Sequence, residues 1–291
     1  MNKPILFSVI MPTYNRANLI GKAILSVVEQ KYANWELLII DDGSTDNTKD
    51  VVLAFYDDRI RYVYQENQER SSARNNGVNL AEGTFVCFLD SDDYYLDNFL
   101  IEFERIIKSN DNKDAFYFCN TFCDMGNGDL QKIPGPDESF LLNYDFLLIN
   151  TIGTPRVCLP ATIAKKNLFD LKIKNGEDFE LWMRLVNDLE IKYNNVYTQV
   201  FIEHKERSIN DNSVHQAVIA TELRVEVAKK YKLKFTKNAY RYFINQNNLK
   251  LARTFFKNNK LACLKFSLKV FLSSSKSKKE AIFMILKSIY N

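Results

Sequence analysis

Short apolar runs alternate with helical stripes along the first 90 residues, and this rhythm constrains the fold more than any other feature. Four apolar runs are typical of strands, at residues 7–11, 35–40, 60–64 and 85–89. Helical patterns separate them, at residues 17–30, 44–56 and 71–81. This alternation predicts an α/β fold with a mostly parallel sheet and helices on both faces. Because the runs are continuously apolar, we expect the strands to be buried on both sides.

The pattern loosens after residue 93. We expect a helix at 98–108, a strand at 115–122, a loop at 125–138, a helix at 179–186 and an extended segment at 193–203. From residue 214 onward Gly and Pro are absent, and the chain is basic with a helical pattern. We therefore predict two domains, an α/β domain at 1–213 and a basic helical region at 214–291.

Charge is divided unevenly along the chain. Residues 224–291 contain 17 Lys and Arg against two acids, whereas residues 1–223 contain 22 basic and 34 acidic residues. A basic tail indicates an anionic partner. Lys260, Lys265 and Lys269 flank apolar helix positions, which suits an anionic membrane surface. A small helical bundle with a solvated Lys face explains the pattern equally well. A nucleic acid is disfavoured, because no recognition module is present and the rest of the chain is acidic.

Composition and missing motifs exclude several classes. The 46% hydrophobic and 26% charged residues exclude a disordered chain. The five cysteines are scattered without a CxxC pair, so we interpret them as reduced thiols in a reducing compartment. No cleavable leader and no apolar stretch of about 18 residues occur, so we predict neither a signal peptide nor a membrane span. GxGxxG and GxxxxGK[ST] are both absent, which argues against a dinucleotide-binding fold and a P-loop.

Acidic residues follow the predicted strands where a parallel sheet binds its ligands. Asp41 and Asp42 follow the second strand, and Asp90, Asp92 and Asp93 follow the fourth. Clustered carboxylates repel one another unless a cation or a proton intervenes, and a hard divalent ion takes oxygen ligands. The alternative is a turn with a helix N-cap, since Asp and Ser favour both.

Four segments then follow in a characteristic order: SVIMPTYNR, ELLIIDDGSTDNT, SARNNGVNLAEGTFVCFLDSDD and GEDFELWMRL. Together they resemble the family 2 glycosyltransferases with the GT-A fold, over about residues 5–210. The resemblance implies a nucleotide-binding sandwich, with a donor half at about 1–110 and an acceptor half at about 111–213. It also implies inverting transfer of a sugar from a nucleoside diphosphate sugar to an acceptor hydroxyl.

The resemblance implies roles for individual residues. Tyr14 would stack on the base, and Asp42 would accept the imide N–H of uracil, thymine or guanine. Asp92 would bind Mn²⁺ or Mg²⁺, together with His204 in the motif that continues to Arg207 and Ser208. The donor-nucleotide site it implies comprises Pro12, Tyr14, Arg16, Asp42, Arg74, Asp90 and Ser91.

Asp178 is implied to be the catalytic base that takes the proton of the acceptor hydroxyl. Glu177 and Asp178 could instead cap the following helix, whose dipole favours acids at its start. Trp182 lines the acceptor pocket or, as we favour, belongs to the core. Asp93 completes the acidic cluster. One departure is Glu69, which stands where members of the family often carry Gly.

We predict a metal-dependent transferase, with a UDP-sugar favoured as donor and a glycan or lipid-linked glycan as acceptor in cell-surface polysaccharide synthesis. It would be cytoplasmic or peripheral on the cytoplasmic face of the inner membrane. The alternatives are a sugar nucleotidyltransferase and a non-catalytic nucleotide-sugar-binding scaffold. The former needs a Gly-rich basic loop after the first strand, where this chain carries PTYN.

Overall fold

The structure is a computed structural model, and it describes residues 4–133, 135–136, 143–150, 152–204, 214–256, 259–273, 279 and 281–285. The chain divides into two compact units. The first comprises residues 1–142 and 152–207, and the second comprises residues 143–151 and 208–291. Within the described ranges, no helix is both long enough and apolar enough to cross a membrane.

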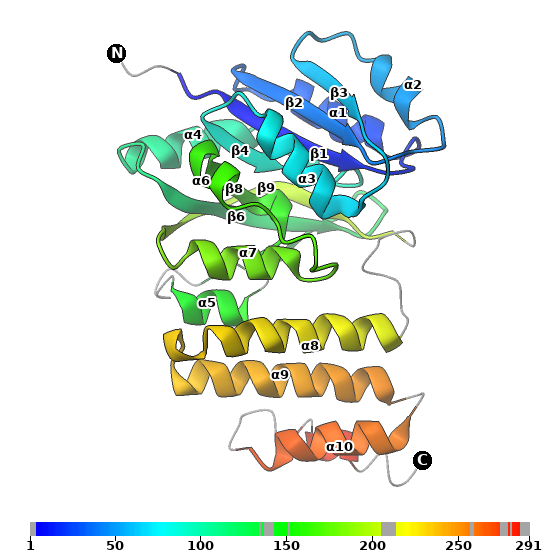
Figure 1. The fold of residues 1–291 in the computed structure, drawn as a ribbon, viewed down its shortest axis with the longest axis vertical. Helices are drawn as coiled ribbons and strands as arrows, with labels where there is room; N and C mark the ends of the chain where they lie inside the picture. Colours follow the sequence, from blue (N-terminus) through cyan, green and yellow to red (C-terminus); the bar gives the residue numbers. More distant parts are fainter. Residues whose placement is uncertain are drawn as a thin grey trace. The chain divides into compact units, whose positions relative to one another are not determined.

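The first four long strands form the parallel part of the sheet, as predicted. They are β1 (Phe7–Thr13), β2 (Trp35–Asp41), β3 (Ile60–Tyr64) and β4 (Phe85–Phe88). All neighbouring pairs in the order β3-β2-β1-β4 run parallel. Every residue of β1, β2 and β4 is buried, as expected for continuously apolar central strands (Figure 1).

Helices cover both faces of this parallel part. Side chains alternate between faces along a strand, and on one face Val9 packs in a core with helices α1 (Ile20–Val28) and α4 (Phe99–Ser109). On the other face, Ile10 approaches Gly77 of α3 (Glu69–Leu80). The short helix α2 (Thr48–Leu53) follows β2. The predicted layers are therefore confirmed, although α1 begins at Ile20, three residues after the predicted start.

The second half of the first unit makes the sheet mixed rather than mostly parallel. Strand β8 (Val157–Pro160) runs antiparallel to both β4 and β6 (Ala115–Asp124), and β9 (Glu190–Ile202) runs parallel to β6. The two-residue strand β5 (Tyr94–Tyr95) pairs antiparallel with the end of β9. The nucleotide-sandwich fold class is confirmed, with the correction that half of the strand pairings are antiparallel.

The predicted loop at 125–138 contains a strand. Residues 130–133 form β7 (Leu130–Ile133), which pairs antiparallel with β6 and is exposed throughout. The hairpin turn uses Gly126 and Gly128, both at φ +84°. The carboxylate of Asp124 accepts hydrogen bonds from both glycine N–H groups, at 2.9 and 3.0 Å. The glycines that suggested a loop therefore make the turn of a hairpin.

Three further short elements have no counterpart in the prediction. They are η1 (Thr154–Arg156), α6 (Ala161–Lys166) and α5 (Tyr144–Ile149). Helix α7 (Glu177–Leu185), which the sequence places at 179–186, starts two residues earlier. Gly176 precedes it at φ +83°, a left-handed conformation that glycine adopts without strain.

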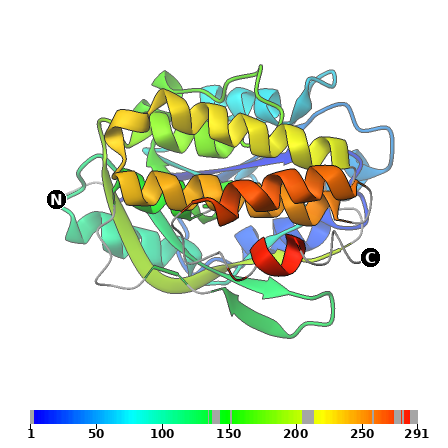
Figure 2. The same ribbon diagram turned by 90° about the horizontal axis from the view of Figure 1, so that it is seen from below.

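The second unit is helical, as predicted for the basic region. It contains α8 (Val214–Lys230), η3 (Lys232–Lys234), α9 (Lys237–Phe255) and α10 (Lys260–Phe271). Figure 1 shows α9 between α8 and α10, and in Figure 2 α9 and α10 run alongside each other. Leu249 of α9, Val270 of α10 and Ala281 form one of its small cores.

Helix α5 belongs to this second unit, although the sequence analysis placed it in the first domain. Its Asp145 accepts hydrogen bonds from the backbone N–H and the hydroxyl of Thr236, at 2.9 and 2.6 Å. The Tyr144 ring packs against Tyr231 and Phe235, with centroids 6.3 and 6.0 Å apart. Such contacts with residues about 90 positions away leave no periodic signal in the sequence.

Candidate active site

The acidic turn after β4 stands at the carboxyl end of a central strand. Asp93 N donates to the Asp90 carbonyl at 3.0 Å, which closes the turn. Asp93 is 2% exposed, and its carboxylate accepts a hydrogen bond from Ile202 N of β9 at 3.1 Å. Ser91 is buried as well. These contacts favour a positioning role for Asp93, whereas Asp90 and Asp92 keep more of their surface accessible.

Arg74 joins the two halves of the first unit through two carboxylates. It donates to Asp90 at 2.8 Å and to Glu177 at 2.9 Å, although the two acids are 87 residues apart in the chain. Arg70, one helical turn earlier on α3, contacts the same oxygen of Glu177 at 2.9 Å. Glu177 therefore lies between two guanidinium groups at the start of α7, in addition to any interaction with the helix dipole.

Burial and charge act in opposite directions on Arg74, which is 4% exposed. Burial lowers the pKa of its guanidinium, but Asp90 and Glu177 outweigh this and raise the pKa above its ordinary value. The third guanidinium nitrogen, Nε, is buried and has no hydrogen-bond partner among the described residues. Arg74 is thus a fixed positive charge beside the acidic turn.

The structure brings Asp92 and His204 together. His204 Nε2 lies 3.1 Å from Asp92 Oδ2, and Arg16 Nε lies 4.0 Å from the same oxygen. The His204 side chain is 18% exposed and the Asp92 side chain is 13% exposed. His204 lies two residues after the end of β9, and β5 pairs with this end of β9, which brings the two loops together. Arg207 and Ser208 of the predicted motif lie outside the described residues.

This pair suits a divalent ion that completes its coordination with a ligand. A carboxylate and an imidazole are both common ligands of Mn²⁺, and Mg²⁺ is usually held by one or two carboxylates plus substrate phosphates. The described residues contain no group of three or more His, Cys, Asp or Glu arranged to hold a metal. Asp92 and His204 therefore fit an ion bound jointly with a diphosphate, and not an ion caged by protein.

Asp42 lies at the end of β2, 4% exposed. Its Oδ1 accepts hydrogen bonds from the Gln65 side chain at 2.7 Å and from Gln68 N at 3.0 Å. The sequence analysis missed Gln65, although it follows β3 directly and the strand-end rule that selected Asp42 applies to it equally. Asp41 is fixed differently, because it accepts from the Tyr62 hydroxyl at 2.7 Å and from Ser44 N at 2.8 Å.

Tyr14 and Pro12 differ sharply in exposure. Pro12 is buried within β1, opposite Ile40 of β2. Tyr14 follows the strand and is 46% exposed, so its ring face is available to a ligand. The next residue, Asn15, holds a left-handed φ of +50°, and its side chain accepts from Thr45 N at 2.8 Å. This contact ties the loop after β1 to the loop after β2.

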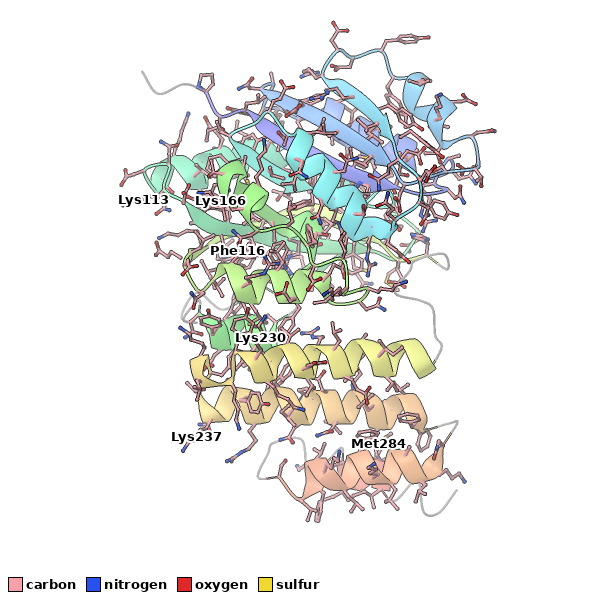
Figure 3. All side chains as sticks on the ribbon, viewed as in Figure 1. Lys113, Phe116, Lys166, Lys230, Lys237 and Met284 are labelled. Carbon is pink, nitrogen blue, oxygen red and sulfur yellow. The ribbon has the colours of Figure 1, made fainter. Side chains whose placement is uncertain are left out.

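Asp178, the predicted catalytic base, and Trp182 both lie on α7 but differ in burial. Asp178 is half-buried, and its carboxylate accepts a hydrogen bond from Phe179 N at 2.7 Å. Trp182 is 2% exposed, packs edge-on against Phe116 (labelled in Figure 3) at 5.0 Å, and donates to the Ile152 carbonyl at 2.8 Å. Its burial assigns it to the core, which was the favoured of the two interpretations, and not to the acceptor pocket.

Glu69 occupies a backbone conformation that suits glycine. Its φ is +74°, a left-handed value that costs an ordinary L-residue about 1–2 kcal/mol. The resemblance to the family led us to expect Gly at this position, and the chain adopts the left-handed backbone with Glu in its place. Its side chain lies 3.3 Å from Lys174, an exposed pair that offsets little of this cost.

Comparison with known proteins decides the family. The sequence model of Glycosyl transferase family 2 matches residues 8–164, more than half of the chain. The chain belongs to glycosyl transferase family 2. This stretch contains the strand-end loops with Tyr14, Asp42 and Asp92, and the resemblance stated from the four motifs is confirmed.

Several relatives are similar in sequence. The UDP-Glc:alpha-D-GlcNAc-diphosphoundecaprenol beta-1,3-glucosyltransferase WfgD of Escherichia coli is 37% identical over 189 residues, which cover 64% of this chain and 72% of WfgD. A putative teichuronic acid biosynthesis glycosyltransferase, TuaG of Bacillus subtilis, is 34% identical over 62% of this chain and 72% of its own length. An uncharacterized glycosyltransferase of Rickettsia felis is 37% identical, but the match spans only 30% of that protein.

Solved structures share the fold. TarS 1-349 of S. aureus in complex with UDP-GlcNAc matches with a TM-score of 0.70 at 21% identity, over 98% of this chain and 88% of that one. The mannosyltransferase PcManGT of Pyrobaculum calidifontis, in complex with GDP-Man and Mn2+, matches with a TM-score of 0.62 at 15% identity, over 99% and 86%. At these identities the likeness shows the fold alone.

Proposed function

We propose that this protein transfers a sugar from a nucleoside diphosphate sugar, with UDP favoured, to an acceptor hydroxyl with inversion at the anomeric carbon. The observation that carries the proposal is the pairing of Asp92 with His204 beside the Arg74–Asp90 ion pair, at the carboxyl end of β4. Family membership and the UDP-GlcNAc bound to TarS support a nucleotide-sugar donor.

The nucleotide would be held by the loops after β1 and β2. The exposed ring of Tyr14 offers a stacking face for the base. Asp42, which Gln65 and Gln68 fix in place, would accept the imide N–H. Pro12 and Ser91 are buried and would shape the site through the backbone. Arg16 would face the diphosphate.

Asp92 and His204 would hold Mn²⁺ or Mg²⁺ together with the diphosphate. The bound ion would supply charge stabilisation for the departing nucleoside diphosphate. The fixed charge of Arg74 would act on the same negative charge, since a guanidinium suits phosphate oxygens. Asp90 would contact the ribose while it orients Arg74.

Asp178 would act as the general base. It would take the proton of the acceptor hydroxyl while that oxygen forms a bond to the anomeric carbon and the bond from that carbon to the diphosphate oxygen breaks. Glu177, clamped by Arg70 and Arg74, fixes the start of α7 and so positions Asp178. The accessible surface of Asp178 is what this role requires.

The acceptor would be a glycan or a lipid-linked glycan of a cell-surface polysaccharide. The names of WfgD and TuaG support this class. A lipid-linked acceptor would place the protein at the cytoplasmic face of the membrane, with residues 1–213 carrying the transfer and the basic helices facing an anionic surface. The half from about 111 to 213 would hold the acceptor.

The test begins with calorimetric titration of UDP, GDP and dTDP into the purified chain, with and without Mn²⁺. We expect one nucleotide, UDP, to bind in a metal-dependent way, and Asp92→Asn to abolish the metal dependence. Asp178→Asn should keep nucleotide binding but lower kcat by at least about 100-fold. A folded protein that binds none of the three nucleotides contradicts the donor site. If UDP binds and the Asp178→Asn substitution changes neither its affinity nor any turnover, the scaffold alternative is favoured.

A further inference from the structure

Helix α10 of the second unit is apolar on two opposite sides. Its inner side packs on α9, where Val270 joins Leu249 in one small core and Cys263 joins Ala252 in another. A helix that packs on a neighbour with one side normally carries polar residues on the other, and a helix that is apolar all round is normally buried. The outer side of α10 therefore needs an explanation of its own.

The outer side carries an exposed leucine stripe, which consists of Leu261, Leu268 and Leu272. These residues lie seven and four positions apart, a spacing that places them on one face of the helix, with Leu272 at its C-cap. Leu261 is 78% exposed, Leu268 is 40% exposed and Leu272 is 80% exposed. Single exposed leucines are common, but a row of them rimmed by polar residues is typical of a contact surface.

The segment at 281–285 adds further exposed apolar side chains to this bundle. Ile282 is 41% exposed and Phe283 is 53% exposed. The segment is held in place, because Ala281 and Met284 (labelled in Figure 3) pack into the same two small cores as α9 and α10. Exposed apolar surface therefore comes from two segments that pack on α9.

Lysines flank the leucine stripe. Lys260, Lys265 and Lys269 are exposed, and their helical positions place them on both sides of the leucines. The sequence contains no acid between Glu226 and Glu280, so α9 and α10 contain cations and no carboxylate. The acids of the second unit that the structure describes lie on α5 and α8, and α9 separates α8 from α10 (Figure 1).

An anionic membrane fits this surface better than a second copy of the chain does. Two copies that met stripe to stripe would bring the lysines of both α10 helices together, and like charges in a contact are unfavourable. An anionic bilayer offers an apolar layer to the leucines and negative headgroups to the lysines. Lysine side chains can reach such headgroups while their aliphatic stems stay against the apolar layer.

We propose that α10 lies in the interface of an anionic membrane, with the leucine stripe inserted and the flanking lysines at the lipid headgroups. The proposal goes beyond attraction of a basic surface, because it names one helix face and requires that its side chains enter the bilayer. It rests on the proposed location at a membrane and not on the proposed chemistry of transfer.

The first experiment places a fluorescent probe on the stripe of the full chain. Leu272→Trp labels the stripe, and Leu53→Trp labels α2 of the first unit, where Leu53 is 53% exposed. The native Trp35 and Trp182 are each 2% exposed and give a constant background. With vesicles of phosphatidylcholine and phosphatidylglycerol, we expect the emission of Leu272→Trp to shift to the blue and to be quenched by brominated acyl chains. The emission of Leu53→Trp should stay unchanged.

The second experiment compares two double variants that leave the charge unaltered. Leu261→Gln with Leu272→Gln changes the stripe, and Leu25→Gln with Leu53→Gln changes two exposed leucines of the first unit. In co-sedimentation with the same vesicles, we expect the stripe pair to lose at least about tenfold in affinity and the control pair less than about twofold. Because Leu261 and Leu272 are mostly exposed, the thermal midpoint should not change, and if it falls the tryptophan shift decides.

Two outcomes would overturn the proposal. One is vesicle binding without a blue shift that about 0.5 M NaCl abolishes, because screened attraction of the basic surface then explains it. The other is no vesicle binding together with a dimer in light scattering that the stripe pair dissociates, which assigns the stripe to a contact between copies. UDP titration in parallel tests the donor site separately, so loss of UDP binding with retained insertion contradicts the transfer function alone.

Discussion

Arg74 is a buried cation that forms ion pairs with two acids, Asp90 and Glu177, from opposite halves of the first unit. Replacing it by Gln leaves Asp90 and Glu177 with one cation fewer in a buried place, a change that typically costs about 3–5 kcal/mol. Arg70 contacts the same glutamate but is 37% exposed, so Arg70→Gln should cost less than about 1 kcal/mol. Urea unfolding of both variants measures the difference. Equal losses would mean that Glu177 draws its stabilisation from both arginines alike.

Glu69 offers a prediction in the opposite direction. Because its φ of +74° suits glycine, Glu69→Gly should relieve about 1 kcal/mol of backbone strain and raise the thermal midpoint. Glu69→Ala keeps the strain and removes the same side-chain contact with Lys174, so it is the matched control. A midpoint that rises equally in both variants would assign the effect to the side chain and not to the backbone.

Individual site residues could be predicted where they directly follow a recognisable strand. Asp42, Asp90 and Asp92 follow apolar runs, and the structure places all three at the carboxyl ends of strands. The partners of these residues were harder to foresee, because Arg74 and Glu177 meet across 103 positions and only the fold defines their distance. The burial of Trp182 was equally hard to predict, because its neighbours in the sequence do not reveal that Phe116 packs against it.

Helix α3 packs so closely on the sheet that a methyl group does not fit at one position. A Cβ on Gly77 would lie 2.4 Å from a methyl carbon of Ile10. Gly77→Ala should therefore destabilise the protein by about 1–3 kcal/mol, despite the better helix propensity of alanine. On α1, a Cβ at Gly21 meets only Val51 at 4.0 Å, so Gly21→Ala should stabilise by up to about 1 kcal/mol. Denaturant midpoints of the two variants should move in opposite directions.

Elements with a distinct apolar run or helical stripe were predictable, and elements without one were not. Strands β1 to β4 and helices α3 and α4 match the expected positions within about two residues, because continuous apolar runs and helical stripes identify them. Strand β8 has four residues and ends at Pro160, and β7 is exposed and polar, so neither has a recognisable period. Both form because neighbouring strands offer hydrogen bonds, which is a tertiary effect.

The division into two units predicts how a shortened chain behaves. A chain of residues 1–213 keeps α5 but removes its partners, so Tyr144 loses the rings of Tyr231 and Phe235, and Asp145 loses Thr236. We expect this fragment to bind the dye ANS more strongly than the full chain. Replacing residues 143–151 in the fragment by a Gly-Ser linker should abolish the excess fluorescence. Equal dye binding by the fragment and the full chain would contradict the assignment of α5 to the second unit.

The pairing of β5 with β9 fixes the spacing of Asp92 and His204 from both sides. Tyr94 lies opposite Val200, and Asp93 binds Ile202, immediately before the loop that carries the histidine. Strand β6 pairs parallel with β9 through the same stretch, with Phe122 opposite Val200, so this part of β9 is held on both edges. The loops that join these strands can therefore vary in length without altering the distance between Asp92 and His204. A chain that keeps this three-stranded ladder can change the surface those loops present and still hold its carboxylate and its imidazole side by side.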